Sequence, residues 1–106
     1  MVLNMENIIM ANQFNNLILA GSDPASVYEN KIRPYLNKHE SFYQIFDIQT
    51  MTCVAYAYRC TRVQLYVDLA HYATVSGKRN GTTDFIIHVY GLWSDGTKHL
   101  IAMEEF

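Results

Sequence analysis

The sequence predicts an α+β fold in which two N-terminal helices pack on a strongly curved, cone-like antiparallel sheet of four to five strands. Apolar residues near the N-terminus follow a helical period, and from Phe42 onward the period changes to two. The dipeptides Asn80-Gly81 and Asp95-Gly96 are typical of tight hairpin turns. With 106 residues, the chain is expected to form one domain over residues 1–106, with residues 1–4 as candidates for disorder.

The first helix is predicted over about residues 5–20. Apolar residues recur there with a period near 3.6, and Asn4 is a candidate cap. Gly21 is expected to end this helix.

A second helix is predicted to follow directly. Ser22 or Asp23 can cap it, and Pro24 suits its first turn because proline fits best where an amide hydrogen is not needed. Pro34 falls inside the same apolar pattern. Since proline clashes with the preceding turn, it is expected to break or kink this helix near Arg33.

Three later segments alternate with period two and are predicted to be strands, at residues 42–48, 54–60 and 63–75. The last has an aliphatic face and a mixed polar and aromatic face, as in a half-buried strand. It is longer than an ordinary strand, so the sheet is expected to bend strongly.

The two hairpin turns set the expected register of the closing strands. Pairing through Asn80-Gly81 places Tyr90 opposite His71, with His88 diagonal to His71. Pairing through Asp95-Gly96 places Ile101 opposite Tyr90. His71, His88 and Tyr90 are therefore expected on one mostly aliphatic face.

These three residues are the candidate catalytic group. A neutral, buried histidine can act as a general base, and a tyrosine can donate a hydrogen bond to a developing oxyanion. They would then serve an isomerase, cyclase or dehydratase acting on a small apolar ligand in a pocket. The alternative is that they are polar core residues that satisfy one another, and whether the chain is an enzyme stays open.

The opposite face is expected to form an interface. Its apolar and aromatic surface is large for a monomer, which favours a homodimer, a non-enzymatic interaction module or a small inhibitor protein. The candidate interface residues on this face are Tyr66, Tyr72, Val89, Trp93 and Leu100.

Composition narrows the classes of function. The net charge of -2 and the pI near 6.0 argue against nucleic-acid binding. The apolar patch at residues 8–11 lacks a basic leader and is soon interrupted by polar residues, so we expect neither a secretory signal nor a membrane span. Cys53 and Cys60 are expected to be unpaired, which suits a cytoplasmic protein. No cofactor is indicated, and no metal site, since the histidines lack a clear third ligand.

The first helix ending in residues 19–23 and the closing segment His88–Lys98, with its Asp-Gly turn, resemble the nuclear transport factor two-like superfamily. That superfamily includes SnoaL-like cyclases and relatives of ketosteroid isomerase. The resemblance implies a cone-shaped α+β fold, frequent dimers and an apolar pocket at the mouth of the cone. It transfers no catalytic residue to a position of this chain.

Overall fold

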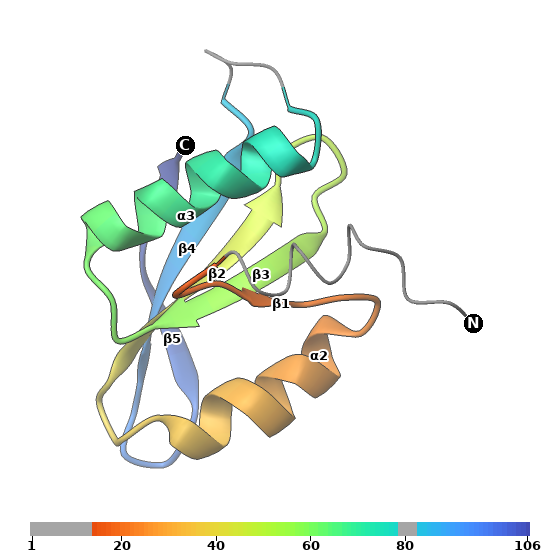
Figure 1. Cartoon of the computed structure of the whole chain (residues 1–106). Helices are drawn as coiled ribbons and strands as arrows, with labels where there is room; N and C mark the ends of the chain where they lie inside the picture. The colour runs from red at the N-terminus through yellow and green to blue at the C-terminus, as the bar shows by residue number, and fades with distance from the viewer. Residues whose placement is uncertain (1–13, 79–82) are drawn as a thin grey trace.

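The computed structural model describes residues 14–78 and 83–106. The five strands of this part of the chain form one antiparallel sheet in the order β1-β3-β2-β4-β5 (Figure 1). Two helical segments lie on opposite sides of the sheet, α3 on one and the segment beginning with α2 on the other. The α+β class is therefore confirmed. The sheet is neither closed nor strongly curled, so the predicted cone-like curvature is wrong.

The first element of the described chain is a strand. β1 (Ile18–Leu19) pairs antiparallel with β3, and the N–H of Ala20 donates to the carbonyl of Val54 at 2.9 Å. The helix predicted over residues 5–20 is therefore wrong for its described part. Its earlier part, including the candidate disordered residues, lies outside the described residues.

The second predicted helix is confirmed. Asp23 caps α2 (Pro24–Val27), because its carboxylate accepts the N–H of Ser26 at 3.2 Å. The helix continues through a π-helical turn (Tyr28–Ile32) and a 3₁₀ turn (Arg33–Tyr35). Pro34 lies in that last turn, so the helix ends where the proline was expected to break it.

The first two period-two segments are strands, as predicted, and the structure pairs them in a hairpin. β2 (Ser41–Asp47) pairs antiparallel with β3 (Cys53–Tyr58), with an irregularity after Ile45. In the connecting turn, the Asp47 carboxylate accepts the N–H of Gln49 at 2.8 Å.

The third period-two segment is α3 (Arg62–Val75), so the strand predicted over residues 63–75 is wrong. Thr61 and Gln64 form a capping box, in which each side chain accepts the backbone N–H of the other residue. The buried residues Leu65, Asp68 and Leu69 are three and four positions apart, which is the spacing of one helix face. Two leucines four positions apart satisfy both the helical and the alternating pattern, and this explains the error.

β4 (Phe85–Leu92) pairs antiparallel with β2 on one side and with β5 (Lys98–Glu105) on the other. Because residues 62–75 are helical, the register predicted through Asn80-Gly81 is wrong, and His88 lies opposite Gln44 of β2. The dipeptide itself falls in residues 79–82, which lie outside the described residues.

The hairpin at Asp95-Gly96 is confirmed. Its predicted register holds where Ile86 lies opposite Glu105 and His88 opposite Met103. A β-bulge then shifts the pairing by one residue, so Tyr90 lies opposite Leu100 and not opposite Ile101 as predicted. The turn itself contains Gly96 with a positive φ of 87°, a conformation that glycine adopts without steric cost.

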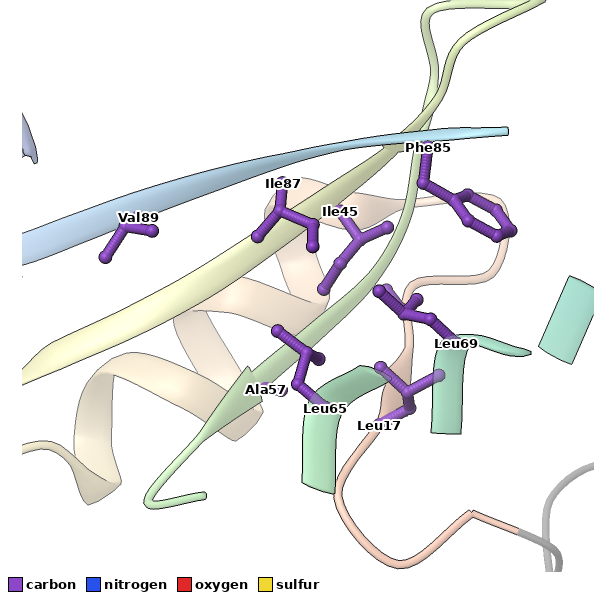
Figure 2. Packing of buried hydrophobic residues seen from close by; sticks show 9 residues of the cluster. Leu17, Ile45, Ala57, Leu65, Leu69, Phe85, Ile87 and Val89 are labelled. Atoms are coloured by element: carbon purple, nitrogen blue, oxygen red, sulfur yellow. The ribbon is translucent and has the colours of Figure 1, made fainter. Parts of the chain in front are cut away.

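The largest cluster of buried residues lies between α3 and the sheet. Leu65 and Leu69 from α3 pack with Ile45, Ile87 and Phe85 from the strands (Figure 2). We call this side of the sheet the α3 face. On the other side, which we call the α2 face, Ile32 of the helical segment packs with an aromatic and aliphatic set consisting of Ala20, Phe42, Tyr56 and Leu92.

A buried carboxylate on α3 binds the backbone directly before β1. Asp68 is 4% exposed, and its Oδ2 accepts the N–H of Asn16 at 2.7 Å and that of Leu17 at 3.2 Å. Because both donors would otherwise be poorly satisfied, we expect Asp68→Ala to lower the free energy of unfolding by about 1–3 kcal/mol. Chemical denaturation measures this change. Glu29→Ala, which removes an exposed ion pair with Arg33, is the control and should have little effect. A small effect of Asp68→Ala would contradict the anchoring role.

Candidate functional site

A polar group lies within the otherwise aromatic α2 face. His88 and Tyr90 project from β4, and Gln44 lies opposite His88 on β2. The Nδ1 atom of His88 and the hydroxyl of Tyr90 are 3.2 Å apart. The prediction that these two residues lie together is therefore confirmed.

His88 is held in a partly desolvated position. Its ring lies 4.6 Å from that of Phe46, centroid to centroid. Burial lowers the pKa of His88, and the nearby charge of Lys98 lowers the pKa further. Burial likewise raises the pKa of Tyr90. The pair is therefore a neutral imidazole beside a protonated phenol at neutral pH.

Lys98 connects this pair to the helical segment. Its ammonium lies 4.7 Å from the ring centroid of Tyr90 and 4.9 Å from that of Tyr28, which is the geometry of a cation–π contact with both rings. On the same face, Gln44 donates to the hydroxyl of Tyr56 at 3.2 Å. Sequence reasoning missed these residues, although a glutamine in an otherwise apolar strand is a signal that could have identified Gln44.

Hollows of different size open on the described surface. One of about 420 Å³ opens between α2 and the sheet and is lined by Tyr28, Gln44, Tyr56 and Lys98, among others. Another, of about 270 Å³, is formed by Ile86, Met103, Glu104 and Glu105. A third, of about 490 Å³, lies where β1 leads into α2. The side chains of His88 and Tyr90 line none of these three.

His71 is not part of this group. It lies on the exposed side of α3, with its ring 5.5 Å from that of Phe14. The expected grouping of His71 with His88 and Tyr90 is therefore wrong, because it depended on the strand that proved to be α3.

The expected interface face is also divided. Tyr66 and Tyr72 belong to α3 and are half-buried, and Val89 is buried beneath the helix. Trp93 and Leu100 are 53% and 48% exposed. The five residues therefore do not form one surface, and the two exposed ones lie in and beside the closing hairpin.

That hairpin ends at an open edge. Within residues 14–78 and 83–106, no strand pairs with the outer side of β5. Leu100, Ile101 and Met103 of β5 are 48%, 55% and 61% exposed. An eight-residue edge strand with exposed apolar side chains is unusual, because sheet edges are commonly shortened or protected by charge and proline.

Three further features of the described chain concern metal ions, membranes and thiols. Its cysteines, histidines and acidic residues form no group of three that could hold a metal ion. None of its helices is long and apolar enough to cross a membrane. Cys53 and Cys60 are free thiols, as predicted.

Fold and site together define an α+β protein with an open antiparallel sheet, a neutral histidine–tyrosine pair and an exposed edge strand. Comparison of the chain with family models, with curated proteins and with solved structures finds no match.

The lowered pKa of His88 predicts a dependence of stability on pH. Since the unfolded chain binds the proton more readily than the folded one, the free energy of unfolding should fall as the pH drops below about 6.5. His88→Gln should remove this part of the pH dependence. Denaturation at several pH values measures it.

A second variant separates the two causes of the lowered His88 pKa, which are burial and the charge of Lys98. Lys98→Met should raise the pKa of His88 in an NMR titration, while Lys31→Met on the helical segment should leave it unchanged. An unchanged His88 pKa in the Lys98 variant would contradict the contribution of this charge.

Proposed function

We propose that the chain is a protein-binding module that acts through the open edge of β5, by adding an extended segment of its partner to the sheet. The observation that carries this proposal is the combination of an unpaired outer side, within the described chain, and three exposed apolar residues on one strand. Backbone groups would supply affinity, and alternate side chains would supply specificity.

Two backbone pairs determine which β5 groups face outward. Phe85 and Phe106 exchange both backbone hydrogen bonds, each at 2.9 Å. Because hydrogen-bonded positions alternate along an antiparallel ladder, the N–H and C=O groups of Met103 and Glu105 point away from β4. On the turn side, the N–H of Trp93 donates to the carbonyl of Thr97 at 2.8 Å, so the same alternation directs Lys98 and Leu100 outward.

One further feature supports this function, and another bears on where the protein acts. Trp93 and Leu100, which sequence reasoning assigned to an interface, are exposed in or beside the closing hairpin. The free thiols of Cys53 and Cys60 suit a reducing compartment such as the cytoplasm, where we propose that the protein acts.

Peptide selection tests strand addition without knowledge of the natural partner. Random ten-residue peptides displayed on phage are selected on the purified chain, and the binders are mapped by NMR. We expect the shifts to concentrate on β5. Met103→Pro removes an outward N–H and should abolish binding, whereas Met103→Ala keeps that N–H and should weaken binding less. Circular dichroism confirms that both variants are folded. Binders that map elsewhere, or that bind the proline variant equally well, would refute the proposal.

A second candidate is a small-ligand protein of the isomerase, cyclase or dehydratase type. It is favoured by the hollow of about 420 Å³, where Lys98 links the lining to Tyr90 and hence to His88. His88 would accept a proton, and the Tyr90 hydroxyl would stabilise an oxyanion. Membership of the nuclear transport factor two-like superfamily stays a proposal of the same kind.

The fluorescent dye anilinonaphthalene sulfonate, an apolar anion, tests this hollow. Because Lys98 supplies the positive charge there, we expect Lys98→Met to weaken dye binding several-fold while Lys31→Met does not. Fluorescence titration measures both. Equal dye binding by the two variants would exclude this hollow as the ligand site.

A further inference from the structure

The outer side of β5 has an internal symmetry that the bulge creates. We call a β5 residue outward-facing when its backbone N–H and C=O groups point away from β4. The outward-facing residues are Lys98 and Leu100 before the bulge and Met103 and Glu105 after it. In a regular strand, residues three positions apart, as Leu100 and Met103 are, have their side chains on opposite faces. Here the register places Leu100 opposite Tyr90 and Met103 opposite His88, two residues of β4 that share the α2 face.

All four outward-facing residues therefore share one face. Lys98 lies opposite Leu92 and Glu105 opposite Ile86, and these two β4 positions are also an even number of residues from His88. The outer edge thus presents, in order along one face, a cation, two apolar side chains and an anion. Their spacing is the same when counted from either end.

We propose that this edge binds the β5 edge of a second copy of the chain, with the two-fold axis between Ile101 and Ala102. This inference rests on the proposed function. Antiparallel self-pairing in this register places Lys98 opposite Glu105 of the second copy, and Leu100 opposite Met103 of the second copy. Opposite charges and apolar side chains then meet as favourable cross-strand pairs.

The backbone supports the same register. Each of the four outward-facing residues meets an outward-facing residue of the second copy, which permits about eight backbone hydrogen bonds across the interface. The bulge adds one residue to each β5 strand at positions that face each other in the dimer, so the pairing register is the same on both sides of the bulge. On the α3 face, His99 would lie opposite Glu104 of the second copy. Glu104 already pairs with Arg62, so this row adds no unmatched charge repulsion.

Charge reversal tests this register. Lys98 and Glu105 lie at opposite ends of β5, roughly 20 Å apart in one copy, so they cannot contact each other within a chain. Lys98→Glu and Glu105→Lys each place like charges opposite each other twice in the dimer. Each should raise the dimer dissociation constant about tenfold. The double variant restores opposite charges and should return the constant to within about twofold of the original.

Analytical ultracentrifugation measures these constants. Lys31→Glu, a charge reversal outside the sheet, is the control and should not change them. Thermal unfolding checks that Lys98→Glu remains folded, since Lys98 also contacts two tyrosine rings, and Glu105→Lys provides an independent single variant. A chain that stays monomeric at millimolar concentration, or a double variant as weak as the single ones, would overturn the inference.

A spin label locates the contact. Attached at Glu105→Cys in a copy whose native Cys53 and Cys60 are replaced by alanine, it should broaden the amide signals around Lys98 in a mixed sample with an isotope-labelled copy. Broadening elsewhere would contradict the register. The outcomes separate the two proposals. If selected peptides bind β5 but the chain does not self-associate, strand addition stands and self-pairing fails. If peptides map away from β5, strand addition itself fails.

Discussion

The packing of α3 across the sheet determines the topology of the molecule. β3 and β4 both pair antiparallel with β2, so they run parallel to each other on either side of it. Parallel strands cannot be joined by a tight turn and need a crossover over one face. α3 lies in that crossover, and Leu65 and Leu69 fix it by packing with Ile45 and Ile87. β4 then takes its place beside β2, and β5 becomes the edge.

This crossover also explains which predictions succeeded. The strands β2 and β3 and the Asp95-Gly96 hairpin depend on local alternation and turn chemistry, which are readable from neighbouring residues. The segment from Val63 to Val75 satisfies a strand pattern as well as a helical one. The sequence signal that distinguishes the two is the Thr61–Gln64 capping box, which marks a helix start and has no role in a strand. The length of the segment, unusual for a strand and ordinary for a helix, pointed the same way.

The candidate site was predictable only as far as it lies within one strand. His88 and Tyr90 are two residues apart on β4, so their proximity follows from strand geometry regardless of what pairs with β4. His71, Tyr66 and Tyr72 were placed through long-range pairing, and one wrong element moved all three. Lys98 reaches Tyr28 because the helical segment covers the α2 face, and the chain carries no local sign of that contact.

The bulge in β5 has two consequences that act together. Bulges are commonly found on sheet edges, where they disturb pairing with a regular strand and so limit aggregation. A partner strand that carries one extra residue at the matching place is not disturbed in this way. A second copy of β5 meets that condition by symmetry, while an ordinary strand does not. The same irregularity that excludes unselected partners would therefore favour self-pairing, and this is how an edge can be both exposed and selective.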